Sequence, residues 1–323
     1  MRITGISRRP VLAAGIAGLA MLAVPATAQQ QAREPAATPR ETPCELHAGP
    51  TRAVVRVIDA ETVLLEDGRE VRLIGALAPR SPDMSPNAST WPPEQQSEAA
   101  LRDLVLGNSV ELAYSAQRRD RYGRLLAHLF LNRDGARGWV QGELLRTGHA
   151  RAYGLPGSFA CMRELLAYER VARAAGAGLW SNAAYAARPA FRPRALLRQR
   201  NTYQVVAGRV AHVATTKSYT YVNFGKDWRT DFTAGIAAKL VRKYPAWAKT
   251  LAALDGKKVE VRGWIEYRNG PFIDVEDPSQ IATVDDDARP QSAAPGGPLL
   301  SSERGAPPQK RKRPAKKPGA VDL

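Results

Sequence analysis

Arginine and aromatic side chains are the residues of this chain whose types point most directly to a binding chemistry. The 323 residues include 47 Lys and Arg against 31 Asp and Glu, which gives a formal net charge of +16. A charge of this size favours a polyanionic partner, such as nucleic acid, an acidic surface polymer or an anionic lipid. The alternative is that arginine simply serves as the default charged surface residue.

A second group with a recognisable chemistry lies between residues 219 and 229. Tyr219 and Tyr221 alternate along one predicted strand and therefore share a face, and Trp228 and Arg229 follow closely. Aromatic rings beside basic groups stack the bases of single-stranded nucleic acid, so these four residues are candidate nucleic-acid contacts. The competing interpretation is that the large aromatic residues of this region fill the core of a small barrel. Those residues are Phe224, Trp228 and Trp264.

The N-terminus has the features of an export signal. Arginines precede an apolar run over residues 11–24, and small residues at 26–28 suit a cleavage site. The run is shorter than the roughly 20 apolar residues of a spanning helix, so residues 1–28 are predicted to be a signal peptide whose removal leaves no stable membrane span. The pair Arg8 and Arg9 also fits a twin-arginine signal, the alternative being an ordinary secretory one. We therefore expect a periplasmic or secreted protein.

The sequence contains two cysteines, Cys44 and Cys161. Export favours a disulfide between them, because such bonds persist in oxidising compartments, and two free thiols are the alternative. Residues 29–50 are rich in Gln, Ala, Pro, Glu and Thr, and are predicted to be a disordered lead-in. Ordered structure is expected to begin near Thr51.

Hydrophobic periodicity predicts a first folded domain over residues 51–181. Asp67 and Gly68 lie between two apolar runs, and this pair favours a β-hairpin because the turn needs positive φ. Periodicity also predicts further elements along this domain. These are helices at 94–106, 139–145 and 161–175, and strands at 110–114 and 125–131.

A smaller second domain is predicted at residues 201–284, after a proline- and arginine-containing linker at 182–200. Its predicted order is three strands, a helix over 240–254 and two strands, which is the order of a five-stranded OB-type barrel. Residues 285–323 are rich in Pro, Ala, Ser and Gly and end in Lys and Arg clusters. This segment is predicted to be a disordered basic tail.

Four short motifs within residues 51–181 resemble the signature of the thermonuclease (staphylococcal-nuclease-like) family. They are Val-Ile-Asp-Ala-Glu-Thr-Val at 57–63, Val-Arg-Leu-Ile-Gly at 71–75, Asp-Arg-Tyr-Gly-Arg-Leu-Leu-Ala at 120–127 and Gly-Leu-Trp at 178–180. They occur in the family's order, and together they are far more specific than any one alone. The resemblance implies a mainly β fold with α-helices (α+β). It consists of an OB-type five-stranded barrel with helices, followed here by the second, smaller OB-like barrel.

The resemblance also implies a calcium-dependent phosphodiesterase that cuts DNA and RNA. Such a site needs carboxylate ligands for Ca²⁺, a carboxylate base and two arginines on the phosphate. Carried over to this sequence, Arg72 and Arg124 are the catalytic, phosphate-binding arginines, whose planar forks suit phosphate oxygens. Glu61 stands at the first metal-ligand position and keeps the negative charge on a longer side chain.

The sequence departs from the family pattern over residues 76–80. Leu77 replaces an expected aspartate ligand, and Arg80 replaces the expected glutamate base. An apolar side chain cannot ligate Ca²⁺, and arginine stays protonated in proteins. We therefore expect a site that binds phosphate through Arg72, Arg80 and Arg124 and cleaves weakly or not at all. No cofactor is expected, except Ca²⁺ if the site is active. Arg80 equally fits a solvated loop charge.

Three hypotheses follow from these residues. The first is an exported protein that binds DNA, RNA or another polyanion on a thermonuclease-like scaffold with impaired catalysis. The second is an active calcium-dependent nuclease, in which Asp83 or Glu94 supplies a missing carboxylate. The third is a cell-envelope interaction protein that uses both barrels for protein or polymer contacts.

Overall fold

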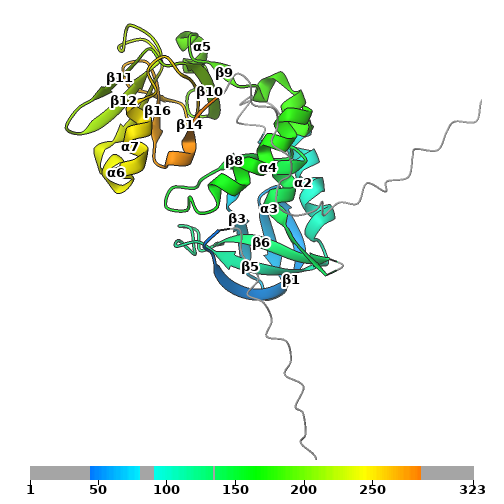
Figure 1. The fold of residues 1–323 in the computed structure, drawn as a ribbon. Coiled ribbons are helices and arrows are strands. Elements are labelled where there is room, and N and C mark those ends of the chain that lie inside the picture. Colours follow the sequence, from blue (N-terminus) through cyan, green and yellow to red (C-terminus); the bar gives the residue numbers. More distant parts are fainter. Residues whose placement is uncertain (1–43, 81–90, 134, 285–323) are drawn as a thin grey trace, which may run out of the picture. The chain divides into compact units, whose positions relative to one another are not determined.

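The computed structural model of the chain describes residues 44–80, 91–133 and 135–284 (Figure 1). The predicted signal peptide, the lead-in up to residue 43, Asp83 and the basic tail lie outside the described residues. Two hydrophobic cores form, one within each predicted domain. No helix in the described part of the chain is long and apolar enough to cross a membrane.

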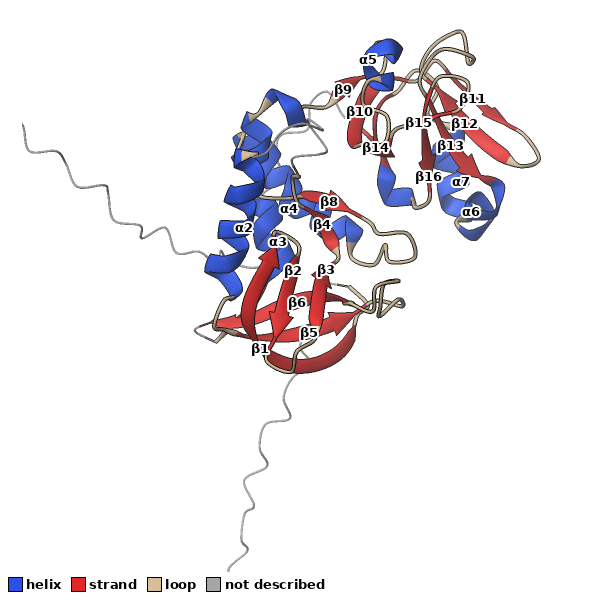
Figure 2. Cartoon of the chain, turned by 180° about the vertical axis from the view of Figure 1, so that it is seen from behind, coloured by secondary structure: helices blue, strands red, loops and turns tan. Residues whose placement is uncertain are grey.

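Five strands close into a barrel in the first domain (Figures 1 and 2). Antiparallel pairing gives the order β3-β2-β1-β5-β6, and parallel pairing of β3 with β6 closes the ring. This confirms the mixed β and α fold with an OB-type barrel. The strands are β1 (His47–Asp59), β2 (Thr62–Leu65), β3 (Glu70–Leu73), β5 (Ser109–Tyr114) and β6 (Leu125–Arg133), and β7 (Ala136–Trp139) extends the sheet beyond β6.

The barrel forms because leucine and β-branched residues recur at inward positions of these strands. Val63, Leu65 and Val71 are fully buried on either side of the predicted hairpin turn. Gly68 in that turn has φ of 78°, a conformation that L side chains rarely adopt. Strand β1 begins at His47, so ordered structure starts earlier than the expected boundary at residue 51. The added residues pair with β5, His47 lying opposite Tyr114.

Three helices and a short two-stranded sheet accompany the barrel (Figure 2). Helix α4 begins after Cys161 and ends at Gly176, both of which have left-handed backbone conformations. The short sheet pairs β4 (Gly75–Leu77) with β8 (Arg151–Tyr153) in antiparallel fashion. The helices are α2 (Pro92–Val105), α3 (Val140–Arg146) and α4 (Met162–Ala175), and the short 3₁₀ helix η1 (Gly178–Ser181) follows.

The segment predicted to be a linker, 182–200, is instead built into the second domain. Strand β9 (Arg188–Pro189) pairs in parallel with β10 (Tyr203–Arg209). Helix α5 (Pro193–Leu197) places Leu196, 1% exposed, in the second hydrophobic core. The prolines that suggested a linker stand at places where a missing N–H is tolerated, such as the first turn of a helix. The 3₁₀ helix η2 (Ala183–Tyr185) opens the segment.

The second domain contains a four-stranded sheet, β17-β14-β10-β9, and a five-stranded sheet, β11-β12-β13-β16-β15. The predicted helix over 240–254 is divided into α6 (Ala238–Lys243) and α7 (Pro245–Ala252), since a proline cannot continue the helix before it. A closed OB-type barrel in this domain stays a prediction. The strands not yet given are β11 (His212–Thr215), β12 (Tyr219–Asn223), β13 (Thr233–Ala237), β14 (Lys258–Trp264), β15 (Glu266–Tyr267), β16 (Pro271–Val275) and β17 (Ile281–Thr283), with the 3₁₀ helix η3 (Pro278–Gln280) before the last.

Candidate phosphate-binding site

Glu61 occupies the turn between β1 and β2. The side chain of Asp59 shapes this turn, because its Oδ1 accepts a hydrogen bond from the Glu61 backbone N–H at 2.7 Å. The backbone oxygen of Glu61 accepts from the N–H of Leu73 at 2.8 Å. These bonds fix the Glu61 backbone, and only 4% of the residue is exposed.

The buried carboxylate of Glu61 is engaged by three donors. Its Oε1 accepts the backbone N–H of Ala78 at 2.8 Å. Its Oε2 accepts from the guanidinium groups of Arg80 at 2.6 Å and Arg72 at 3.4 Å. Among the described residues, the one carboxylate of Glu61 therefore pairs with two guanidinium groups.

Strand β4 and the residues after it bring the substituted positions to Glu61. Leu77 ends β4 and is 3% exposed, and the chain then places the N–H of Ala78 against the Glu61 carboxylate. The Arg80 side chain is 47% exposed, so its guanidinium contacts Glu61 while remaining accessible to solvent. Arg80 is thus more than a solvated loop charge. The sequence did not predict this ion pair, because its partners are 19 residues apart and belong to different motifs.

Arg124 is held by a carboxylate of its own motif. Its Nε donates to Oδ2 of Asp120 at 2.8 Å, and Asp120 Oδ1 accepts the backbone N–H groups of Tyr122 and Arg124. Burial alone would raise the pKa of Asp120, but the Arg124 guanidinium and these N–H donors hold it below its usual value. Arg124 directly precedes β6, whose Leu126 is the pairing partner of Arg72. The two predicted phosphate-binding arginines therefore lie in β3 and directly before its neighbour β6.

Tyr153 is an aromatic residue near this site that no motif singled out. It ends β8 and lies opposite Gly75 in the pairing of β8 with β4. Burial raises the pKa of Tyr153, while a hydrogen bond with Trp264 and the positive charge of Arg72 act to lower it. Sequence periodicity alone gave no signal for this tyrosine, because β8 is only three residues long.

In the second domain, Tyr219 and Tyr221 form one of the predicted aromatic groups. Their rings stack along β12 with centroids 5.6 Å apart. The guanidinium of Arg268 lies 5.6 Å from the Tyr219 ring, but it also pairs with Glu266 and Asp274 at 3.6 and 3.7 Å. The charge around this tyrosine pair is therefore mixed, which makes it less suited to a phosphate backbone than the sequence suggested.

Trp228 and Arg229 form a separate group in the loop between β12 and β13. The Trp228 side chain is 52% exposed, and the Arg229 guanidinium lies 4.7 Å from its ring centroid. The interpretation of these aromatics as core residues is therefore wrong for Trp228. Trp264 is also partly exposed, at 39%, whereas Phe224 is buried in the second core.

The carboxylates of the described residues do not gather into a metal-binding group. Across residues 44–80, 91–133 and 135–284, no three His, Cys, Asp or Glu side chains lie together as potential ligands. Glu94, one of the two carboxylates considered as replacements, lies in the first turn of α2.

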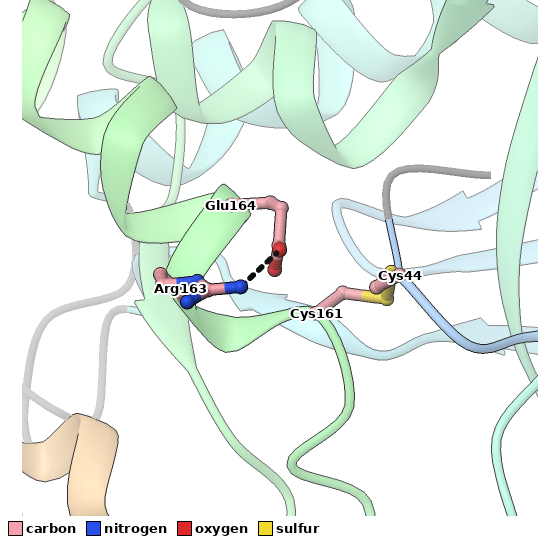
Figure 3. Close-up of a disulfide and its surroundings, with 4 residues drawn as sticks. All are labelled: Cys44, Cys161, Arg163 and Glu164. Atoms are coloured by element: carbon pink, nitrogen blue, oxygen red, sulfur yellow. Dashed lines mark ion pairs between the residues drawn. A yellow bond between two sulfur atoms is a disulfide. The ribbon is translucent and has the colours of Figure 1, made fainter. Parts of the chain in front are cut away.

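A disulfide joins Cys44 to Cys161, with the two Cα atoms 5.2 Å apart (Figure 3). Cys44 precedes β1 and Cys161 caps the N-terminus of α4, so the bond ties the start of the described chain to a helix far along the sequence. The neighbouring Arg163 and Glu164 form an ion pair at 3.7 Å, with the Arg163 side chain 92% exposed. The disulfide therefore fixes one end of the helix that packs beside β8.

Comparisons with known proteins agree with this geometry. The family model for staphylococcal nuclease homologues matches residues 70–182. The thermonuclease of Staphylococcus hyicus is 27% identical over 135 residues, which is 41% of this chain and 76% of that protein. The thermonuclease of Staphylococcus intermedius is 31% identical over 107 residues, or 32% of this chain and 60% of that protein. Residues 70–182 of the first domain therefore match the staphylococcal-nuclease-like family.

Proposed function

We propose that the nuclease-like domain binds the phosphodiester backbone of nucleic acid and cleaves it weakly or not at all. The observation that carries this proposal is the pairing of Glu61. Its carboxylate accepts hydrogen bonds from Arg80 at 2.6 Å, from the Ala78 N–H at 2.8 Å and from Arg72 at 3.4 Å. A carboxylate engaged in this way has few lone pairs left for a metal ion.

The described residues at this site do not fit a Ca²⁺ ion. Ca²⁺ takes about six to eight oxygen ligands, several of them carboxylates. Leu77, which stands at a ligand position by resemblance, is apolar and 3% exposed. Arg80 places a fixed positive charge beside Glu61, and this charge would repel a cation. No chemical step through a metal ion is therefore part of this proposal.

The same residues suit an anion. Arg80 and Arg72 keep 47% and 22% of their side chains exposed, and Arg124 keeps 23%. In Arg72 and Arg124, a phosphate group can accept from guanidinium N–H donors that do not contact Glu61 or Asp120, because each guanidinium has five of them. Asp120 then acts as a positioning residue that holds Arg124 in place, whereas Glu61 shares the donors of Arg72 and Arg80 with the phosphate.

We propose nucleic acid, DNA or RNA, as the partner, although the site chemistry suits other polyanions as well. The net charge of +16 supports this choice, and the exposed Trp228 with Arg229 offers a further contact. We also propose that the protein is exported and acts in the periplasm or outside the cell. The N-terminal signal pattern supports this, and a disulfide is most stable in such an oxidising compartment.

Fluorescence anisotropy with a labelled single-stranded oligonucleotide tests this function on the full chain. We expect the affinity for the oligonucleotide to fall with increasing salt and to be the same in the presence of Ca²⁺ and of a chelator. Arg72→Ala should weaken binding about tenfold or more, since hydrogen bonds to charged groups contribute about 1.5–3 kcal/mol. Arg163→Ala is the matched control, because it removes the same charge from a fully solvated position outside the site.

A cleavage assay on the same samples decides between the alternatives. Ca²⁺-dependent cleavage that Arg124→Ala abolishes would replace this proposal with an active nuclease. Absence of salt-dependent binding to DNA and RNA would favour a cell-envelope interaction protein instead.

A further inference from the structure

Strand β8 contacts both the arginine site and the second domain. On one side it pairs with β4, the strand that ends at Leu77 and leads to Arg80. On the other side, the backbone oxygen of Ala152 accepts hydrogen bonds from Tyr203 Oη at 3.0 Å and from Arg262 Nη1 at 3.4 Å. All these residues belong to one compact unit of the chain. The second domain therefore contacts the strand next to the candidate site.

Two ion pairs of opposite polarity join α4 to β14 and fix this contact. Glu169 of α4 accepts two hydrogen bonds from the guanidinium of Arg262, at 3.0 and 3.2 Å. One helical turn later, Arg173 donates to both oxygens of Glu260, at 2.7 and 2.6 Å. Glu169 and Arg262 are 1% and 7% exposed, so sliding one element past the other would leave a buried charge without its partner. The pairs therefore set the position of β14 relative to β8.

This positioning brings Trp264, the last residue of β14, against Tyr153. The two rings meet edge to face with centroids 6.2 Å apart, and Tyr203 packs edge to face on both, at 6.0 and 5.1 Å. Edge-to-face contacts on two sides hold the indole in a defined orientation. Because Trp264 is still 39% exposed, part of its ring is open to solvent.

Tyr153 connects this aromatic group to the arginine site. It lies opposite Gly75 in the pairing of β8 with β4, and β4 lies between Arg72 and Arg80 in the chain. Trp264 therefore contacts a residue of the strand that pairs with β4, the strand leading from Arg72 to Arg80. In a single-stranded polynucleotide, each base is joined to its phosphate through one sugar, so a base lies close to every bound phosphate.

We propose that Trp264 is a base-stacking residue that the second domain supplies to a single-stranded polynucleotide bound at Arg72. This inference rests on the proposed function. An indole face accepts any base, so the contact adds affinity without strong sequence preference. The second domain is then part of the binding site rather than an independent module.

Two ligands of equal length test this role on the full chain: an oligonucleotide, and a phosphodiester strand of abasic deoxyribose. Trp264→Ala should weaken oligonucleotide binding about 5- to 150-fold, the change that corresponds to one lost stacking contact. It should leave binding of the abasic strand unchanged. Trp264→Phe should restore most of the affinity, and Phe191→Ala, at an aromatic residue that is 73% exposed, is the matched control.

The outcomes separate this inference from the function on which it rests. If Arg72→Ala weakens binding of both ligands while Trp264→Ala weakens binding of neither, the stacking role is wrong and the proposed function stands. Equal weakening of both ligands by Trp264→Ala would show a purely structural role and would also overturn the inference. If Arg72→Ala changes the affinity for neither ligand, the proposed function itself fails.

Discussion

At the scale of single residues, the pairing of Glu61 with Arg80 determines the chemistry of the site. A carboxylate that is 4% exposed needs partners that compensate for its lost hydration. Arg80, Arg72 and the Ala78 N–H provide them from within the chain. The positive charges beside Glu61 therefore belong to arginine side chains of the chain itself and are always present, unlike a metal ion that binds and dissociates. Under the proposed function, this arrangement gives constant affinity for anions in place of a metal-dependent reaction.

Replacing Glu61 by Gln distinguishes this arrangement from a metal centre. The carboxylate competes with phosphate for the donors of Arg80 and Arg72, so Glu61→Gln should tighten oligonucleotide binding. We expect about a two- to fivefold change, since a partly exposed ion pair contributes up to about 1 kcal/mol. Anisotropy titrations at fixed salt measure it, with Glu98→Gln on the exposed pair with Arg102 as the control. Weaker binding in Glu61→Gln would contradict the competition.

At the scale of secondary structure elements, helix α4 is fixed near both ends. The disulfide between Cys44 and Cys161 anchors its start, and the ion pairs of Glu169 and Arg173 anchor its later turns. The N–H of Ala152 donates to Glu169 at 2.6 Å, so β8 is aligned by the same helix. The position of Tyr153 beside the arginine site therefore depends on how α4 is held.

Removing the disulfide should lower stability because the bond closes a long loop, its two cysteines being 117 positions apart in the sequence. For Cys44→Ser combined with Cys161→Ser, we expect the free energy of unfolding to fall by about 2–5 kcal/mol. Urea denaturation followed by circular dichroism measures the change. Reductant should destabilise the unmodified protein to the same level and leave the double variant unaffected. A reductant effect on the double variant would show that the disulfide is not the cause.

Sequence patterns predicted the elements that rest on local rules. The hairpin at Asp67 and Gly68 and the helix ending at Gly176 are examples, because both turns need a glycine with positive φ. The segment 182–200 was misjudged, since its burial depends on β10 and on the second core, which are formed by later residues. The prediction of a single helix over 240–254 was also wrong. The apolar periodicity of this segment continues across Pro245, where the structure begins a second helix.

The candidate site was predictable only in part, for a similar reason. Motifs placed Glu61, Arg72 and Arg124, and the structure puts Glu61 and Arg72 in contact. The ion pair of Glu61 with Arg80 and the proximity of Tyr153 follow from tertiary packing between segments without a shared motif. Such contacts are not encoded in local spacing, so the pattern of one sequence does not reveal them.

At the scale of the whole molecule, a buried histidine should make stability depend on pH. His128 lies in β6 with 1% exposure and packs edge to face on Trp139, with centroids 5.2 Å apart. Burial lowers the pKa of His128 from 6.5 to about 3. In the unfolded chain the ring regains its usual pKa, so below pH 6.5 the unfolded state binds a proton that the folded state does not.

The free energy of unfolding should therefore fall as the pH decreases below about 6.5. His128 contributes a slope of about 1.4 kcal/mol per pH unit until carboxylates begin to titrate near pH 4.5. Denaturation curves at several pH values measure this slope, and His128→Leu should reduce it over that window. An unchanged slope in the variant would mean that other groups cause the pH dependence.

The net charge of +16 has a separate consequence for binding, because each neutralised phosphate releases condensed counterions. The logarithm of the association constant should fall linearly with the logarithm of salt concentration, by about 0.7 for each single-strand phosphate contacted. Deleting residues 285–323 removes the basic clusters at 310–313 and 316–317, so the slope should become less steep by up to about 4. The effects of Arg72→Ala and Trp264→Ala should persist in the shortened protein, since Arg72 contacts Glu61 and Trp264 contacts Tyr153 and Tyr203, all of which are retained. If the deletion abolished binding at low salt, the basic segment rather than the nuclease-like domain would be the principal nucleic-acid contact.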